Sequence, residues 1–238
     1  MADDTAVDDA AADASAEETE EETTPVDPAR EAFVAAMGEA LAAAGSDMVE
    51  SHIGVTETWV RVPRDSWVEA VGAARNAMGC TWLDYIAGID WLPSPFGRDM
   101  DSEQDWVVHG REENEPEEMQ HGYAGGATRF QVMCRVANVS SGAAVIIKAD
   151  LPDDDVSLPT LIPVFPGANW HEREMWEMYG IDITGHPDLR VLYLPSGFEG
   201  NPMRKDYPLL ARRVKPWPGI VDVEQMPGED DDSDGSDA

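Results

Sequence analysis

The sequence predicts an α+β fold of two layers, in which helices cover one face of a mixed or antiparallel sheet. The expected elements follow in the order helix, two strands, helix and three strands, which suits helices packed on one side of a sheet. This order is not a regular alternation of strand and helix, so a doubly wound nucleotide-binding fold is disfavoured. Hydrophobic residues make up 42% of the 238 positions, which is enough for one core.

The first part of the domain is expected to hold two helices and two strands. Apolar side chains recur every four positions in Ala29–Ala44, the spacing of one helix face, and a glycine follows. Alternating polar and apolar residues predict strands over Asp47–Val55 and Thr58–Val62. A second helix is expected between Pro63 and Gly79, because proline favours a helix start and glycine a helix end.

Three further strands follow, interrupted by a long insertion. Thr81–Trp91 is rich in large apolar residues and is expected to be a buried strand. Residues 93–128 break the pattern with prolines, glycines and a run of charges, which favours a surface loop over a small subdomain. Arg129–Ala137 and Ala143–Ala149 then predict a hairpin across a turn-rich connection. These elements place an α+β domain over residues 28–180.

The chain changes character after the last of these strands. Leu158–Phe165 is expected to be a short helix or a turn. Asn169–Tyr179 predicts a helix with Asn169 as its N-cap, the acidic Glu172 in its first turn and a glycine beyond its end. Residues 181–227 are rich in proline and lack periodicity, so we expect an extended docking tail that lies along this domain or along a partner.

Both ends of the chain are strongly acidic. The sequence holds 48 acidic and 16 basic residues, a net charge of −32. Residues 1–27 and 228–238 contain few large apolar side chains, so both are expected to be disordered. An acidic surface repels phosphate backbones and anionic lipids, so no nucleic-acid partner is expected. Solubility explains the charge more simply than a dedicated basic partner does.

The number and spacing of the cysteines limit the metal and iron–sulfur sites that this chain could hold, and its hydropathy bears on membrane association. Cys80 and Cys134 are far apart and lack CxxC spacing, so this chain alone cannot supply a four-cysteine iron–sulfur or zinc site. Two isolated thiols fit a reducing cytoplasm. The acidic N-terminus does not resemble a signal peptide, and no apolar run approaches the ~20 residues of a membrane helix. Any membrane association is therefore expected to pass through a partner.

The last predicted helix carries residues that could serve a metal site or general acid–base catalysis. His171 and Glu172 would begin a zinc-protease motif, but Met175 stands where that motif needs a second histidine. A site formed by His171, His186 and a carboxylate is an alternative. Catalysis by Glu172 or Glu174 would require a cleft and a pKa raised by burial.

A structural role is the favoured interpretation of these charges. Arg173 and Glu177 are four residues apart and can pair on one helix face, and charge-assisted hydrogen bonds can lock the helix to neighbouring backbone. Arg204, Lys205 and Asp206 could hold a phosphate, but the aspartate and the proline that follows favour a fixed ion pair at an interface. No nucleotide-binding loop or nucleophile elbow is recognisable, so no cofactor or metal is predicted in this chain.

The segments Ala168–Ile181, His186–Leu192 and Phe198–Pro208 combine charged and aromatic residues with glycine and proline at fixed spacings. Together they closely resemble the signature of the 30 kDa subunit family of respiratory complex I, known as its C subunit. The resemblance is strong over residues 158–209. The chain departs from the family at Glu177, where aspartate is common, and at Val191, where a second arginine is often found.

The resemblance implies that a set of positions serves as family motif and interface. These positions are Trp170, Glu172, Arg173, Glu174, Glu177, Tyr179, Gly180, His186, Arg190, Arg204, Lys205 and Asp206. We expect Glu172–Tyr179 to anchor the domain and Gly185–Pro208 to make the main contact with a D-like subunit. No catalytic residue is expected among them.

The resemblance also implies a place in a larger enzyme. The family is a non-redox subunit of NADH-quinone oxidoreductase, a respiratory-chain translocase that uses NADH, FMN, iron–sulfur clusters and quinone and couples electron transport to proton translocation. Such a subunit is a peripheral membrane protein of the peripheral arm, at the cytoplasmic face of the cell membrane. The implied partners are the D-like subunit of the quinone site and the iron–sulfur proteins known as the B and I subunits.

Two alternatives stand beside this interpretation. A membrane-bound hydrogenase, or a complex linked to F420 or ferredoxin, contains an equivalent subunit with the same signature. A freestanding metal-dependent hydrolase would instead use His171, Glu172 and His186.

Overall fold

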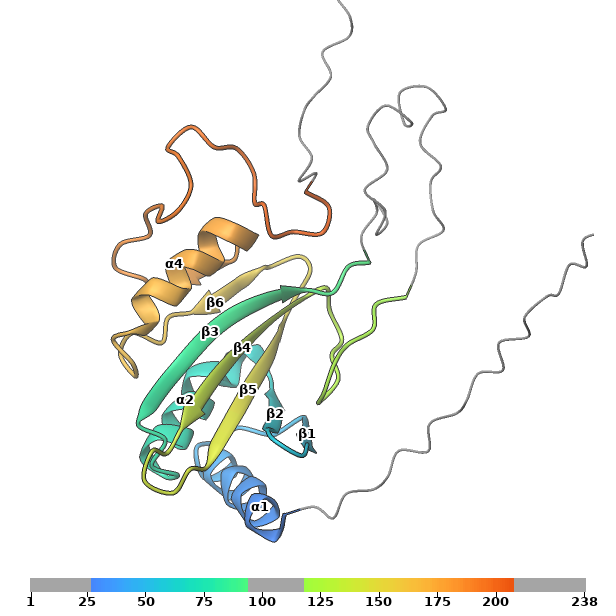
Figure 1. Cartoon of the computed structure of the whole chain (residues 1–238), viewed down its shortest axis with the longest axis vertical. Helices are drawn as coiled ribbons and strands as arrows, with labels where there is room; N and C mark the ends of the chain where they lie inside the picture. The colour runs from blue at the N-terminus through green and yellow to red at the C-terminus, as the bar shows by residue number, and fades with distance from the viewer. Residues whose placement is uncertain (1–26, 94–117, 208–238) are drawn as a thin grey trace, which may run out of the picture.

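The computed structural model describes residues 27–93 and 118–207 (Figure 1). The expectations for the two acidic ends and for residues 94–117 fall outside these residues and stay predictions, as do the proposed domain boundaries. The described residues form a mixed five-stranded sheet with three α-helices, which confirms the predicted α+β fold class.

The main sheet has the strand order β1-β2-β5-β4-β3. Its strands are β1 (Glu50–Ile53), β2 (Thr58–Val62), β3 (Trp82–Asp90), β4 (Phe130–Ala137) and β5 (Ala144–Leu151). All neighbours are antiparallel except β2 and β5, which are parallel. The parallel pair arises because helix α2 (Trp67–Asn76) carries the chain from β2 to the far edge, and β3, β4 and β5 then return strand by strand.

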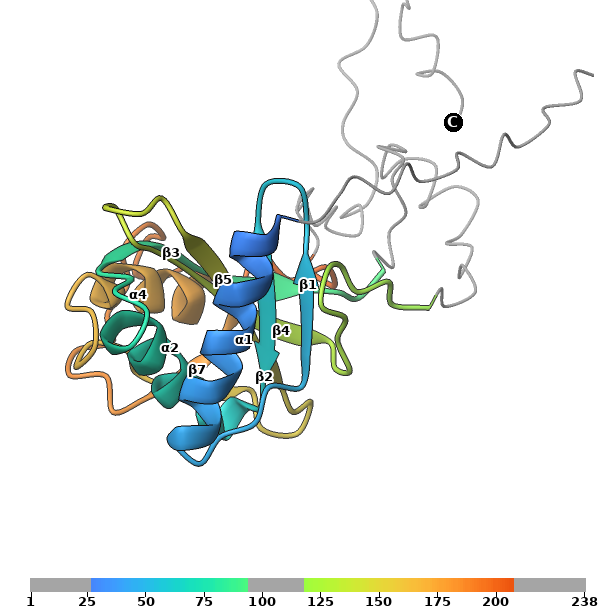
Figure 2. The same ribbon diagram turned by 90° about the horizontal axis from the view of Figure 1, so that it is seen from below.

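Three helices share one hydrophobic core with one face of this sheet (Figure 2). Helix α1 (Pro28–Ala43) begins where the Asp27 carboxylate accepts a hydrogen bond from the Ala29 N–H at 2.9 Å. Helix α4 (Ala168–Tyr179) packs against β3, where a Cβ on Gly88 would lie 3.1 Å from the ring of Tyr179. The shared core includes Met37, Leu41, Val60, Trp67, Val71, Val132, Cys134, Ile147, Met175 and Tyr179.

The opposite face of the sheet carries buried polar side chains that hold the end of the insertion. The ammonium of Lys148 donates to the carbonyl oxygens of Tyr123, at 2.9 Å, and Gly125, at 3.1 Å. The guanidinium of Arg61 donates to the carbonyl of Ala124 at 2.8 Å. Burial lowers the pKa of Lys148 to about 8. Residues 118–129 contain no helix or strand and lie against the sheet through these contacts.

Two local expectations around α4 are corrected. The helix begins at Ala168, so the prediction of Asn169 as N-cap is wrong, and Glu172 lies beyond the first turn. The reason is a preceding turn that leads directly into the helix, because the Ala168 N–H already donates to the carbonyl of Phe165 at 2.9 Å.

A small second sheet replaces part of the segment expected to be a short helix or a turn. Strand β6 (Ser157–Pro159) pairs in parallel with β7 (Asp182–Thr184), and turns follow β6 before α4 begins. Each strand has only three residues, too few for alternation to be recognised in the sequence.

Candidate functional site: a segment fixed on helix α4

Helix α4 buries charged side chains as well as apolar ones. Met175 and Tyr179 face the core, while Glu172, Arg173 and Glu177 are also buried, at 1%, 7% and 5% exposure. Charged groups are seldom buried unless they are paired or hydrogen-bonded, so the partners of these three side chains define what this helix does.

Glu172 fastens the start of α4 to the loop after β6. Its carboxylate accepts hydrogen bonds from the Thr160 hydroxyl at 2.6 Å and from the Leu161 N–H at 2.5 Å. Burial raises the pKa of Glu172, and these two hydrogen bonds oppose that shift. Because the residue is only 1% exposed, a dissolved substrate cannot reach it, which argues against general acid–base catalysis by Glu172.

Arg173 and Glu177 bind the backbone of the C-terminal segment, defined as residues 185–207. The guanidinium of Arg173 donates to the carbonyls of Arg190 at 3.0 Å and Val191 at 3.2 Å. The carboxylate of Glu177 accepts from the next backbone groups, the N–H of Leu192 at 2.9 Å, of Tyr193 at 3.0 Å and of Leu194 at 2.7 Å.

These contacts are the charge-assisted hydrogen bonds to neighbouring backbone that the sequence predicts. Within the described part of the chain, Arg173 and Glu177 do not form the expected ion pair with each other. Each side chain instead forms hydrogen bonds with the backbone of the C-terminal segment. Burial alone would raise the pKa of Glu177, but the N–H groups of Leu194, Leu192 and Tyr193 outweigh it, and the pKa is lowered.

The end of α4 holds the next part of the segment. Gly180 adopts the left-handed conformation with φ of 69°, and its N–H donates to the carbonyl of Trp176 at 3.0 Å. The amide of Asn201 donates to the Glu177 carbonyl at 3.0 Å, and the Met203 N–H donates to the carbonyl of Met178 at 3.1 Å. These bonds use the carbonyls that a helix end leaves free.

Asp90 fixes the end of the segment, and the sequence did not reveal this role. Its buried carboxylate accepts from the Lys205 N–H at 2.8 Å and from the guanidinium of Arg129 at 2.7 and 2.9 Å. Arg129 also pairs with Asp206 at 3.0 Å within this chain, and the expected ion pair at an interface stays a prediction. The signal that could have found Asp90 is an acidic residue at the end of a strand predicted to be buried.

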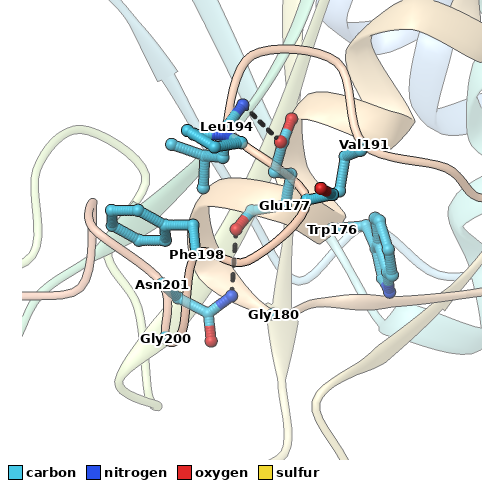
Figure 3. A pocket seen from close by; sticks show the side chains of 10 residues that line it. Trp176, Glu177, Gly180, Val191, Leu194, Phe198, Gly200 and Asn201 are labelled. Atoms are coloured by element: carbon cyan, nitrogen blue, oxygen red, sulfur yellow. Dashed lines mark hydrogen bonds between the residues drawn. The ribbon is translucent and has the colours of Figure 1, made fainter.

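The segment and α4 enclose a small pocket (Figure 3). Its volume is about 230 Å³, and Trp176 and Phe198 lie on opposite sides of it in Figure 3. Other lining residues are Glu177, Gly180, Val191, Leu194, Pro195, Ser196, Gly200 and Asn201. Large apolar side chains of the segment are exposed: Val191 (48%), Tyr193 (64%), Phe198 (40%) and Met203 (50%). The arrangement is a rigid backbone that presents apolar side chains.

The remaining predicted positions fall into separate environments. Trp170 is 64% exposed beneath the Arg173 guanidinium, and Glu174 makes no hydrogen bond within residues 27–93 and 118–207. Arg190 is exposed and pairs with Asp188 at 2.9 Å. The structure therefore brings Glu177, Arg173 and the segment together but leaves Trp170 and Arg190 at the surface.

His186 lies beside Glu172 without forming a metal site. Its Nε2 is 4.0 Å from the Glu172 carboxylate, too far for a hydrogen bond, and its Nδ1 accepts from the Asp188 N–H at 3.0 Å. Within the described ranges, no three His, Cys, Asp or Glu side chains are grouped so that they could hold a metal ion. His171, Glu172 and His186 all lie in those ranges, so the described residues give no support to the metal-site alternative. No described helix is long and apolar enough to span a bilayer.

Residues 60–213 match the model of the family described as "Respiratory-chain NADH dehydrogenase, 30 Kd subunit". The chain belongs to this family. It is 35% identical over 135 residues to the C/D subunit of NADH-quinone oxidoreductase from Photorhabdus laumondii. This match covers 57% of this chain and 21% of that relative. It is also 34% identical over 154 residues to the C/D subunit from Erwinia tasmaniensis, with 62% of this chain and 24% of the relative covered. The family member therefore spans less than a quarter of the length of these relatives.

Two solved structures are similar to this 30 kDa family member. One is a trypsin-resistant fragment of Nqo5, 26% identical with a TM-score of 0.45, covering 67% of this chain and 99% of the fragment. The other belongs to a membrane-bound sulfane sulfur reductase, an archaeal respiratory membrane complex. That match is 18% identical with a TM-score of 0.53, covers 82% of this chain and 95% of the other, and shows a shared fold.

Proposed function

We propose that this chain is the non-redox 30 kDa subunit of the peripheral arm of an NADH-quinone oxidoreductase. In this role it assembles and positions the quinone-reducing module, at the cytoplasmic face of the membrane, while NADH, FMN, iron–sulfur clusters and quinone are bound by other subunits. Family membership over residues 60–213 supports the proposal. The relatives are named NADH-quinone oxidoreductase, which disfavours the hydrogenase, F420 and ferredoxin alternatives.

The observation that carries an assembly role is the fixed C-terminal segment. Arg173 and Glu177 together satisfy five backbone groups of residues 190–194, so this stretch is ordered without any helix or strand of its own. Tyr193 nevertheless points its side chain outward, at 64% exposure. Holding an exposed aromatic side chain on a rigid backbone lowers the entropy cost of binding a partner, and such side chains often dominate interface energies.

The D-like subunit is the proposed main partner of the segment. The name of the relatives, C/D, joins a C part and a D part in one polypeptide, and the present chain corresponds to less than a quarter of each relative. Two parts of one polypeptide are held close together, which supports direct contact between the separate subunits. The iron–sulfur B and I subunits are proposed as further partners on the strength of the family alone.

The test is capture of the D-like subunit from membranes dissolved in mild detergent. Tyr193→Asp places a charge in the middle of the proposed contact, and we expect capture to fall at least ~30-fold, the effect of losing about 2 kcal/mol at an interface. Val139→Asp is the matched control, because Val139 is 72% exposed in the turn between β4 and β5. Equal capture by both variants and the wild type would contradict the proposal. A chain truncated after Gly180 should also fail to capture this partner.

A further inference from the structure

We propose that residues 118–129 form a strap that opens as a local unit while the rest of the domain stays folded, and that the buried charge of Lys148 sets how often it opens. The strap lies on the face of the sheet opposite the three helices, beside β1 in Figure 2. The inference concerns a conformational device of the fold and is independent of the proposed function.

Side chains of the sheet hold three consecutive carbonyl groups of the strap. The ammonium of Lys148 donates to the carbonyls of Tyr123 at 2.9 Å and Gly125 at 3.1 Å, and the guanidinium of Arg61 donates to that of Ala124 between them at 2.8 Å. The strap contains no residue of a helix or strand. Its backbone is therefore attached to the sheet mainly through side chains and not through a ladder of backbone hydrogen bonds.

The strap has few other attachments to the domain. Ala124 is its one buried residue, at 4% exposure, and its φ of 61° lies in the left-handed region, where a residue other than glycine is strained. The ring of Tyr123 stacks on His52 with 4.4 Å between ring centres, yet this side chain is 60% exposed. Gln131 adds a hydrogen bond to the Gly125 carbonyl at 3.0 Å. Segments with few buried apolar contacts open locally at a lower free energy than the core does, so the strap should open before the sheet.

The closed strap keeps a charged group out of water. Lys148 is only 1% exposed, and its ammonium lies 5.9 Å from the centre of the Trp59 ring and 5.5 Å from that of the Trp91 ring. The two rings and the two carbonyls replace part of its hydration, but burial still lowers the pKa of Lys148 to about 8. The buried charge therefore favours opening, because opening returns the ammonium to water.

The pH dependence of opening follows from this burial. In the open strap Lys148 faces water and has its ordinary pKa of 10.5, so opening takes up a proton between about pH 8 and pH 10.5. A rise in pH therefore favours the closed strap. From these two pKa values, the opening equilibrium should fall roughly 20-fold between pH 7.5 and 9.5.

Charged neighbours from three strands also face Lys148. Asp150 on β5 and Glu50 on β1 raise its pKa, Arg61 on β2 lowers it, and burial outweighs them. The strap also contacts two histidines, since His52 stacks on Tyr123 and the ring of His121 lies 5.5 Å from that of Trp91. A free histidine titrates near pH ~6.5, below the range of this comparison.

Acetylation of lysine in the full-length wild-type chain measures the opening. The reagent attacks an accessible neutral amine, so Lys148 reacts only while the strap is open, whereas the exposed Lys205 is the internal reference. The chain has only three lysines, so mass spectrometry separates the products. Alkylation of Cys80 and Cys134, both 0% exposed in the core, reports unfolding of the whole domain, with free cysteine as the reference.

We expect the opening equilibrium from Lys148 to be at least ~10-fold larger than that from the two cysteines. The ratio of the Lys148 rate to the Lys205 rate should fall roughly 20-fold between pH 7.5 and 9.5. Equal opening equilibria for the lysine and the cysteines would overturn the inference, because the strap would then open only with the whole domain. A rate ratio that stays constant or rises with pH would overturn it as well.

A variant that loosens the strap provides a second measurement. Tyr123→Ala removes the stack on His52, and an aromatic pair of this kind corresponds to about a 2–10-fold change in equilibrium, so the Lys148 rate should rise by that factor. The alkylation rates of Cys80 and Cys134 should stay the same. Val139→Ala, which shortens a side chain 72% exposed in the turn between β4 and β5, is the control and should not change the Lys148 rate. The same Lys148 rate in both variants would count against the strap.

Discussion

Replacing Glu177 by glutamine should release the C-terminal segment from α4 while leaving the sheet intact. Glutamine has the same shape but offers one acceptor oxygen in place of two, and its NH₂ group would face backbone N–H donors. In the wild type, one carboxylate oxygen accepts from Leu192 and Tyr193 and the other from Tyr193 and Leu194. The substitution therefore removes about half of these bonds and the charge that strengthens the rest.

The expected cost follows from the number of bonds lost. A hydrogen bond to a charged group contributes about 1.5–3 kcal/mol, so losing about two of them destabilises the closed segment by roughly 3 kcal/mol. A tenfold change in an equilibrium corresponds to about 1.4 kcal/mol, so opening of the segment should become roughly 100-fold more frequent. Protonation of Glu177 should act in the same direction. Because the folded pKa is below the ordinary 4.5, this stabilisation is complete above pH 4.5 and is lost as the pH falls through the folded pKa.

Amide hydrogen exchange measures this opening directly. The N–H groups of Leu192, Tyr193 and Leu194 should exchange roughly 100-fold faster in Glu177→Gln, while amides of the central strand β5 keep their wild-type rates. Glu174→Gln is the matched control, since it makes the same change on the same helix at a residue with no hydrogen bond to any described group. An increase of less than about threefold at the three amides, or an equal increase in Glu174→Gln, would refute the reasoning.

Two further predictions concern a buried lysine and a left-handed glycine. Burial lowers the pKa of Lys148 from 10.5 to about 8, so the unfolded chain binds this proton more tightly than the folded one. The contribution of Lys148 to the free energy of unfolding should therefore rise by about 2 kcal/mol between pH 7.5 and 9.5. The measurement is urea unfolding of the wild type and of Lys148→Met at each pH, and a difference in unfolding free energy between the two that is flat or falls with pH would contradict the prediction. Gly180→Ala should lower the free energy of unfolding by about 1–2 kcal/mol, because φ is 69° and the new Cβ would lie 2.7 Å from the Asn201 oxygen. Gly197→Ala, with no atom within 4 Å of its Cβ, should leave the unfolding midpoint unchanged, and equal midpoints for both variants would count against the steric argument.

Sequence patterns placed the five strands of the main sheet and predicted the β4–β5 hairpin, but they did not give the other strand pairings. The predicted strand Thr58–Val62 is β2 with the same bounds, because its core-facing and outward-facing residues alternate without interruption. The strand expected over Asp47–Val55 is paired only from Glu50 to Ile53, because its partner β2 is itself five residues long. Alternation gives the face on which each side chain lies, and it carries no information about which strand is the neighbour. The parallel pairing of β2 with β5 could not be predicted for that reason.

The contacts of α4 were predictable in kind, but their partners were not. Charged side chains at Glu172, Arg173 and Glu177 on a helix that packs against the domain predict charge-assisted hydrogen bonds. The structure contains these hydrogen bonds. Their partners lie 11 to 18 positions away along the chain in loops without periodicity. Asp90 was missed because a lone aspartate at a strand end has many ordinary uses, and its partner at Lys205 is 115 positions distant. Family resemblance located the segment, but only coordinates show what holds it.

The division of work between Arg173 and Glu177 explains why this helix needs both charges. Residues 190–194 have no helix or strand, so their backbone groups would be left unsatisfied once a partner covered them. Arg173 takes two consecutive carbonyls and Glu177 takes the three N–H groups that follow, so a side chain of one sign could not serve both sets. Because the backbone is satisfied from beneath by α4, the side chains of Val191 and Tyr193 are free to face outward. The charged residues that resemble an active site in the sequence therefore have a structural role. They hold the backbone of an irregular segment in place, so that the segment presents apolar side chains to solvent.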